Sequence, residues 1–272
     1  VFPLIPCRRC APCGVGAYAQ CEDYDYLGSR SDGGFAELVA VPEWNLLPVP
    51  EGVSLEAAAM AEPAAVAVHA LRQAGIDMGD AVAVYGAGPI GLMLGLWARA
   101  WGAGRVLLVD IDPRKLEFAG RLGFDDVCNG AETDAPAWVA EVTDGRGADV
   151  VVEASGSSPA FEACMLSARA FGRVVLMGNP AGEMRLSQKA YWAILRQELK
   201  LFGTWNSVYK SLPKDEWRLA LDSMASGRLD LKPLITHRVD LDGLWDALVM
   251  VRDRAEFSNK VMYVNPAEGG HA

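Results

Sequence analysis

The stretch that decides the fold is Ala81-Val-Ala-Val-Tyr85-Gly86-Ala-Gly88-Pro-Ile-Gly91. Residues 81–85 are a short apolar run typical of a buried strand, and the glycines follow at once. The mostly apolar residues 92–100 then continue as a helix. A strand, a glycine turn and a helix in direct succession are typical of the unit that binds a dinucleotide in doubly wound α/β domains.

Each glycine of this loop has a separate task in such a unit. Gly86 makes the tight turn, Gly88 lets the backbone approach a pyrophosphate, and Gly91 lets the helix pack on the strand. Pro89 and Ile90 begin the helix, whose N-terminus presents about half a positive charge to the phosphates. We therefore predict cofactor contacts at these five positions.

A second strand pattern, Arg105-Val-Leu-Leu-Val109, ends in Asp110, 19 residues after Gly91. An acid at this point can accept hydrogen bonds from the adenosine ribose of NAD, and it would repel the 2′-phosphate of NADP. NAD is therefore the expected cofactor. NADP is the alternative cofactor because Arg114 is a nearby cation. The alternative for Asp110 itself is an ordinary solvated strand end without a role in binding.

Strand and helix patterns alternate through the rest of this region. We expect helices over 113–122, 135–143, 159–170 and 188–197, and strands over 125–128, 148–152, 172–177 and 199–203. With the two strands above, this predicts a doubly wound parallel sheet of six strands. Ligands bind at the carboxyl ends of such strands. The candidate contacts there, with ordinary turns as the alternative, are Ser155, Gly178, Asn179 and Thr204.

Four of the six cysteines, Cys7, Cys10, Cys13 and Cys21, fall within 15 residues. This C-x2-C-x2-C-x7-C run lets four thiolates converge on one zinc ion, and a zinc with four sulfur ligands has no open position for substrate. We therefore predict a structural zinc. An iron–sulfur cluster is the alternative. The cysteine run of bacterial ferredoxins ends in x3-C-P, whereas here the last gap is seven residues and Glu22 follows Cys21. The separate cysteines, Cys128 and Cys164, are expected to be buried.

Composition excludes several classes of protein. The 272 residues are 51% hydrophobic and 22% charged, which suits a globular chain. The net charge of −10 repels nucleic acid and anionic membranes. Residues 81–98 carry no formal charge, but their glycines and Pro89 argue against a membrane span. We expect a soluble, cytoplasmic protein without nucleic-acid or membrane partners.

The nucleotide-binding pattern lies between two parts of a second domain. Residues 1–68 contain the cysteine lobe (7–21) and a strand-like segment at 32–53, and they form the first part. Residues 69–206 form the nucleotide-binding domain. Residues 207–272 return to the second domain, with a strand, a helix and a strand over 233–264.

This order resembles that of the zinc-containing medium-chain alcohol and polyol dehydrogenases over essentially the whole chain. Further motifs that match are Gly28-Ser-Arg30-Ser-Asp-Gly-Gly-Phe-Ala-Glu37, Glu62-Pro63 and Leu234-Ile-Thr-His-Arg238. The resemblance implies a partial, mostly β, GroES-like catalytic domain into which the NAD-binding domain is inserted. It also implies a structural zinc on the four clustered cysteines, a catalytic zinc site that includes Glu62, and a homodimer or homotetramer. The alternative for Glu62 is an ordinary helix-boundary acid.

In this family zinc activates the substrate hydroxyl and a hydride passes to NAD. The resemblance therefore implies oxidation of a secondary alcohol of a polyol or polyol phosphate to the ketose. Sorbitol-, butanediol- or threonine-type substrates are alternatives within the family. Arg30 and Lys260 are candidate partners of a substrate phosphate, or else ordinary surface cations. A non-catalytic, NAD-binding zinc module is the alternative from another class.

The family's other catalytic zinc ligands, a cysteine and a histidine, precede the cysteine lobe and have no match here. Because the chain begins at Val1, we expect it to be shortened at the N-terminus and inactive alone. His69 is two helical turns from Glu62, roughly 10 Å, which is too far to share one metal. His237 either faces the active site or covers a strand, and His271 belongs to the chain end.

Overall fold

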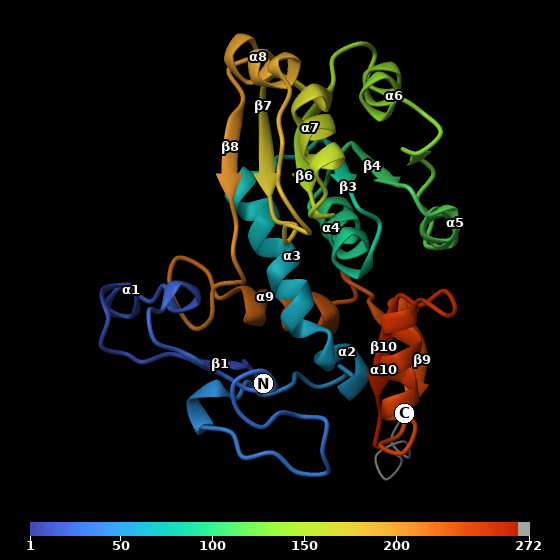
Figure 1. Cartoon of the computed structure of the whole chain (residues 1–272). Helices are drawn as coiled ribbons and strands as arrows, with labels where there is room; N and C mark the ends of the chain where they lie inside the picture. The colour runs from blue at the N-terminus through green and yellow to red at the C-terminus, as the bar shows by residue number, and fades with distance from the viewer. Residues whose placement is uncertain (266–272) are drawn as a thin grey trace. The chain divides into compact units, whose positions relative to one another are not determined.

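The computed structural model describes residues 1–265, and His271 lies outside them (Figure 1). The chain divides into two compact units. One consists of Val66–Thr204, and the other combines Val1–Ala65 with the residues from Trp205 onward. Helix α3 (Ala61–Ala74) contains the first boundary between them.

A six-stranded parallel sheet forms the centre of the first unit, in the order β5-β4-β3-β6-β7-β8. This confirms the predicted doubly wound fold. Strand order runs outward from β3 on both sides, so β3 and β6 flank the point at which a doubly wound sheet binds its ligand. The strands are β3 (Ala81–Tyr85), β4 (Arg105–Asp110), β5 (Val127–Asn129), β6 (Ala148–Glu153), β7 (Ala168–Leu176) and β8 (Lys200–Gly203).

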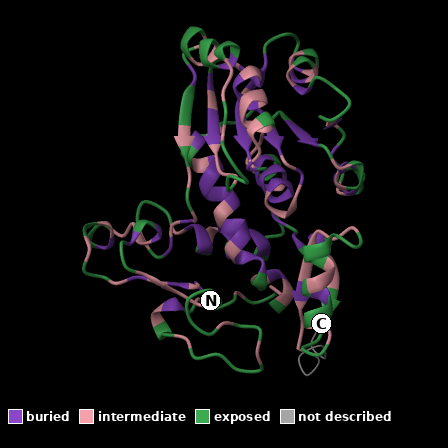
Figure 2. Ribbon diagram, in the orientation of Figure 1, coloured by how far each residue is buried: buried purple, intermediate pink, exposed green. Residues whose placement is uncertain are grey.

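Burial explains why these residues form a parallel sheet. All five residues of β3 are buried, and the valines at 150–152 of β6 have no exposed surface. Helices cover both faces of such a sheet, so its strands are continuous apolar runs rather than alternating ones. Figure 2 shows the central strands as buried along most of their length, whereas β8 at the edge is largely exposed.

The crossover helices begin where the sequence provides caps. Asp112, Asp134, Ser157 and Ser187 each accept a hydrogen bond from a backbone amide of the following helix. In three of these helices a proline lies in the first two positions. The helices of this unit are α4 (Pro89–Ala100), α5 (Pro113–Arg121), α6 (Ala135–Val142), α7 (Ser158–Ser167) and α8 (Gln188–Arg196).

Two segments differ from the expectation. Helix α7 ends at Ser167 rather than at 170, because Ala168 already pairs with Ala148 of β6. Residues 32–53, expected to be strand-like, contain one short 3-10 helix, η2 (Glu43–Asn45), but no strand. Within residues 1–265 this segment pairs with no other strand, so it forms no strand despite its strand-like composition.

The second unit has small sheets and an aromatic core. Phe2 stacks on Tyr209, with ring centroids 4.1 Å apart, and Trp217 meets both rings edge-on. Asn45 Nδ2 donates to the carbonyls of Phe2 and Leu4. The elements are β1 (Leu4–Ile5), α1 (Ala11–Gly14), η1 (Tyr18–Gln20), β2 (Asp25–Tyr26), α2 (Leu55–Ala59), α9 (Glu216–Ala225), η3 (Lys232–Leu234), β9 (Ile235–Val239), α10 (Leu244–Asp253) and β10 (Lys260–Tyr263).

The uncharged residues 81–98 could suggest a membrane-spanning helix, and the lengths of the helices test this. In the described part of the chain, none of the helices combines the length and the apolar character that a bilayer crossing requires. The uncharged stretch is divided between β3 and α4.

The burial pattern predicts the cost of removing a strand side chain. Leu108→Ala in β4 should lower the free energy of unfolding by about 3 kcal/mol, because it leaves a cavity at a fully buried position. Leu38→Ala is the matched control, and it should change that free energy by less than about 0.5 kcal/mol because Leu38 is 90% exposed. Urea denaturation followed by circular dichroism measures the free energy of unfolding of both variants. Equal decreases would contradict the placement of Leu108 in the core and Leu38 at the surface.

Candidate nucleotide and metal sites

The glycine loop after β3 forms a cradle with little room for side chains. Gly86 has a φ of +115°, and a Cβ there would lie 3.1 Å from the carbonyl of Ala154, beyond the end of β6. A Cβ at Gly91 would overlap the carbonyl oxygen of Gly86. These contacts require glycine at both positions and fix the start of α4 against the loop.

The open side of this loop suits an anion. Gly88 is the N-cap of α4 and provides no side-chain cap, so the first amides of the helix keep their hydrogen-bonding capacity. A Cβ at Gly88 would meet no protein atom within 4 Å. Pro89 and Ile90 follow as the first helical residues. A helix N-terminus with unused amides and free approach fits the pyrophosphate of a dinucleotide.

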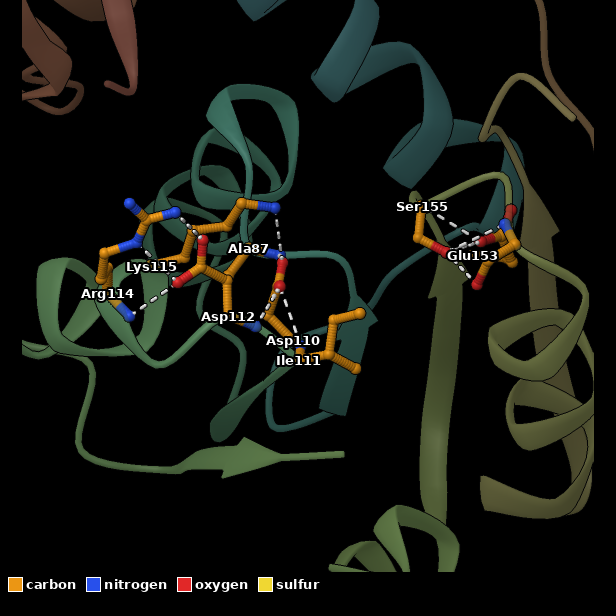
Figure 3. A network of polar contacts seen from close by, with 9 residues as sticks. Ala87, Asp110, Ile111, Asp112, Arg114, Lys115, Glu153 and Ser155 are labelled. Carbon is orange, nitrogen blue, oxygen red and sulfur yellow. Dashed lines mark hydrogen bonds and ion pairs between the residues drawn. The ribbon is translucent and has the colours of Figure 1, made fainter. Parts of the chain in front are cut away.

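Asp110 is 8% exposed, at the end of β4, and its carboxylate has four donors (Figure 3). Oδ2 accepts from the amide of Ala87 at 2.8 Å and from Lys115 Nζ at 3.2 Å. Oδ1 accepts from the amides of Ile111 at 2.8 Å and Asp112 at 3.0 Å. Asp110 therefore joins the glycine loop to the neighbouring strand, and it is not a solvated strand end.

Two basic residues accompany this carboxylate. Lys115 lies in the first turn of α5, five residues after Asp110, and it pairs with that carboxylate. The sequence analysis does not select it as a site residue. Arg114, the cation considered for NADP, is paired with Asp112 instead. Its Nε and Nη2 donate to the two carboxylate oxygens of Asp112 at 3.1 and 2.9 Å.

Glu153 has the corresponding role at the end of β6. Its side chain is buried, and Oε1 accepts from the amides of Ser155 and Gly156 and from the hydroxyl of Ser155, all at 2.7–2.9 Å (Figure 3). Its backbone carbonyl accepts from the amide of Gly178 at 2.9 Å. Glu153 therefore organises the loops after β6 and β7. The signal for this role is an acid at the end of a buried strand, two residues before a Ser-Gly pair, and the sequence analysis does not select it.

The predicted contacts beyond the glycine loop lie on these neighbouring loops. A Cβ at Gly178 would overlap the amide nitrogen of Gly156, and one at Gly156 would overlap the carbonyl oxygen of Asn179. The Ser155 hydroxyl is already bonded to Glu153 and lies 3.0 Å from that of Ser157. The amide of Thr204 donates to the Leu176 carbonyl, while its buried hydroxyl has no hydrogen-bond partner within the described residues.

The four clustered cysteines are brought together, and their sulfur atoms lie within 4.8 Å of one another. Cys10 and Cys21 Sγ are 3.9 Å apart. Zinc–sulfur bonds of ~2.3 Å in a tetrahedron place sulfur atoms about 3.8 Å apart, so this pair already has the required spacing. All six cysteines are free thiols. Soft donors in this arrangement fit one zinc ion held by Cys7, Cys10, Cys13 and Cys21.

The thiols of this lobe differ in their acidity. An amide hydrogen bond from Arg9 is the main reason that the pKa of Cys7 falls to about 6. Burial raises the pKa of Cys13 to about 12. A cation is therefore needed to hold all four groups as thiolates near neutral pH.

Glu62 lies apart from any complete ligand set. It is half-buried in the first turn of α3, and burial raises its pKa, an effect that the charge of Lys260 opposes. Glu62 in turn adds to burial in raising the pKa of Tyr26 to about 12. Within residues 1–265 the cysteine cluster is the sole group of three or more potential ligands close enough to share an ion. The described residues therefore do not by themselves assemble a catalytic zinc site around Glu62.

The remaining candidates already have structural partners. His69 is buried, with Nε2 3.2 Å from Gln73 Nε2, and His237 lies between Thr236 and Glu256. Arg30 donates to the carbonyl of Tyr24 and stacks over its ring. Each of these three side chains therefore has a partner within 20 residues of it in the sequence.

Comparison with known proteins identifies related chains. The family model described as zinc-binding dehydrogenase matches residues 89–226, and the alcohol dehydrogenase GroES-like domain matches residues 1–51. Galactitol 1-phosphate 5-dehydrogenase of Escherichia coli K12 is 34% identical over 93% of this chain and 72% of its own length. D-xylulose reductase A of Aspergillus oryzae is 36% identical over 88% of this chain and 66% of its own length.

Solved structures agree with these relatives. Galactitol-1-phosphate dehydrogenase from Escherichia coli superposes with a TM-score of 0.88 at 32% identity, covering 96% of this chain and 75% of that one. A protein of E. coli CFT073 described as a short chain alcohol dehydrogenase, solved with NADH, has a TM-score of 0.85 at 27% identity, with 96% and 74% covered. A protein of Sinorhizobium meliloti 1021 assigned to the zinc-binding dehydrogenases, bound to NADP, has a TM-score of 0.83 at 29% identity, with 96% and 75% covered.

The glycine contacts predict the effect of one added methyl group. Gly91→Ala should lower the free energy of unfolding by roughly 1–3 kcal/mol and weaken nucleotide binding, because the new Cβ overlaps the Gly86 carbonyl oxygen. Gly120→Ala in α5 is the matched control. Its Cβ would meet no atom within 4 Å, so the change should be neutral or stabilising by up to about 1 kcal/mol. Thermal denaturation and NADH titration test both variants, and similar behaviour would contradict the close contact.

The cysteine cluster predicts one zinc per chain. Cys13→Ser should lose this zinc, whereas Cys128→Ser should keep it because Cys128 is buried away from the cluster in the sheet core. Metal affinity should rise with pH, since binding displaces the thiol protons, above all that of Cys13. Elemental analysis and zinc titration measure these effects. Visible absorbance from bound iron and sulfide, or equal zinc loss in both variants, would refute the assignment.

Proposed function

The chain belongs to the zinc-binding alcohol dehydrogenase family, and we propose that it binds NAD in the oxidation of a secondary alcohol of a polyol or polyol phosphate to the ketose. The observation that carries this proposal is the glycine cradle joined to a buried acid at the end of the next strand. Zinc and NAD are typical cofactors of the family, and a related structure contains NADH.

In this proposal the adenosine half of NAD lies at the end of β4. Asp110 accepts from the ribose hydroxyls and Lys115 holds the carboxylate in place. Gly86, Gly88, Pro89, Ile90 and Gly91 shape the loop and the helix start that receive the pyrophosphate. The nicotinamide half extends along the loops that carry Ser155, Gly178, Asn179 and Thr204.

When bound, NAD supplies the acceptor for a hydride from the substrate carbon. The residues of this chain bind and orient the nucleotide. Glu153 is the positioning residue for the nicotinamide side, because it fixes the amides of Ser155 and Gly156. Glu62 stays a proposed ligand of a catalytic zinc, and no step is derived through that metal because the described residues do not complete its site.

The substrate class is proposed from the relatives. Similarity to galactitol 1-phosphate 5-dehydrogenase favours a galactitol-1-phosphate-like substrate for this chain. Similarity to D-xylulose reductase A favours an unphosphorylated polyol. Sorbitol-, butanediol- and threonine-type substrates are candidates within the family. Lys260 is the preferred candidate for a substrate phosphate, because its charge acts on the proposed zinc ligand Glu62, whereas Arg30 donates to the carbonyl of Tyr24 and stacks on its ring.

Domain organisation and assembly complete the proposal. We assign residues 69–206 to NAD binding, and 1–68 with 207–272 to the catalytic domain. In the described sheet β8 pairs with β7 alone, and Leu201 on it is 39% exposed. An unpaired edge of this kind supports assembly as a homodimer or homotetramer through β8. A cytoplasmic location stays a prediction from composition.

The proposed cofactor role predicts a preference in binding. The chain should bind NADH at least about tenfold more tightly than NADPH, because the carboxylate of Asp110 disfavours a 2′-phosphate. Calorimetric titration with each nucleotide measures this ratio. Equal affinities, or the absence of binding, would refute the proposal.

A panel of polyols and polyol phosphates, with NAD and zinc, tests the proposed oxidation. Formation of NADH with one substrate class supports this oxidation and identifies the class. NADH binding without turnover of any of them agrees both with the incomplete zinc site around Glu62 and with the non-catalytic NAD-binding module.

A further inference from the structure

Four charged side chains surround the end of β4, and they form two closed pairs (Figure 3). Lys115 is committed to Asp110, and Arg114 is committed to Asp112. The four charges sum to zero, so this group presents no uncompensated cation. The group lies where the proposed function places the adenosine ribose of NAD.

Arg114 is the candidate partner of a 2′-phosphate in this group. Its guanidinium is half-exposed on a flexible chain at the start of α5, whereas Lys115 contacts a buried carboxylate. Guanidinium groups bind phosphates through two parallel donors. Here Nε and Nη2 donate to the two oxygens of Asp112, so the donor pair that a phosphate needs is occupied.

We propose that Asp112 is a cofactor-selectivity residue: it retains the guanidinium of Arg114 and thereby prevents this chain from using Arg114 to bind the 2′-phosphate of NADP. This inference rests on the proposed NAD site and adds a second determinant to it. Asp110 repels a phosphate by its charge, and Asp112 withholds the cation that would compensate. The lowered pKa of Asp112, caused first by its hydrogen bonds from Arg114, is consistent with this pairing.

A substitution of Asp110 cannot separate these effects. Its carboxylate accepts from the amide of Ala87 in the glycine loop, so its loss would disturb the pyrophosphate cradle for both nucleotides. Within residues 1–265 the Asp112 side chain makes no hydrogen bond to that loop. It caps α5 by accepting from the amide of Arg114 at 3.0 Å, a role that asparagine and serine also perform.

The experiment compares the affinities for NADPH and NADH in the full chain. Asp112→Asn should improve NADPH binding by about tenfold relative to NADH, because it frees Arg114 and removes one negative charge beside the phosphate. The double variant Asp112→Asn with Arg114→Gln should return to the original ratio. Asp112→Ser provides a second capping variant, and melting temperatures verify that each protein is folded.

Glu117→Gln is the matched control. It changes the net charge equally and frees Arg121, whose Nη1 lies 3.5 Å from Glu117 further along the same helix. This control should leave the nucleotide ratio unchanged. An equal gain in Glu117→Gln, or a gain in Asp112→Asn that survives the loss of Arg114, would overturn the inference.

Failure of the inference can be distinguished from failure of the proposed function. If the unchanged chain bound neither NADH nor NADPH, the proposed NAD site would be wrong, and this inference would fail with it. If it bound NADH while folded Asp112→Asn and Asp112→Ser kept the original ratio, the inference alone would fail.

Discussion

Buried carboxylates at the ends of two strands are the constraint on which the nucleotide unit depends. An ionised side chain in this setting is costly unless donors surround it, and the loop amides provide those donors. Asp110 ends β4 and Glu153 ends β6, and these strands flank β3 on its two sides. The glycine loop after β3 therefore lies between two fixed neighbours: the amide of Ala87 donates to Asp110, and Gly86 packs against Ala154.

This arrangement explains how an acidic chain can hold an anionic ligand. The net charge of −10 opposes phosphates at long range, so attraction must be local. The amides at the start of α4 lack a side-chain cap and can provide that attraction, while other amides donate to both carboxylates and Lys115 pairs with Asp110. Because these bonds exist before the ligand binds, the loop has little ordering entropy left to lose.

The fold could be predicted from the sequence because its signals are local. The apolar run at 81–85, the glycines and the capped helices each act within a few residues. Lys115 and Glu153 are not selected from the sequence because their roles depend on how the loops fold. Lys115 pairs with the side chain of Asp110, and Glu153 accepts from the amides of the loop that follows it. Residues 32–53 carry a strand-like composition, but a strand forms only where a neighbouring strand lies beside it, and composition cannot state this.

The two candidate metal positions illustrate the same distinction. The cysteine lobe is specified by short spacing, and its four sulfur atoms lie within 4.8 Å of one another. Glu62 depends on residues far apart in the sequence: the charge of Lys260 stabilises its ionised form, and Glu62 in turn acts on Tyr26. A metal-binding role for this half-buried acid requires further ligands, which the sequence pattern around Glu62 cannot place. Local spacing therefore predicts the structural zinc site, whereas the proposed catalytic site depends on residues that are distant in the sequence.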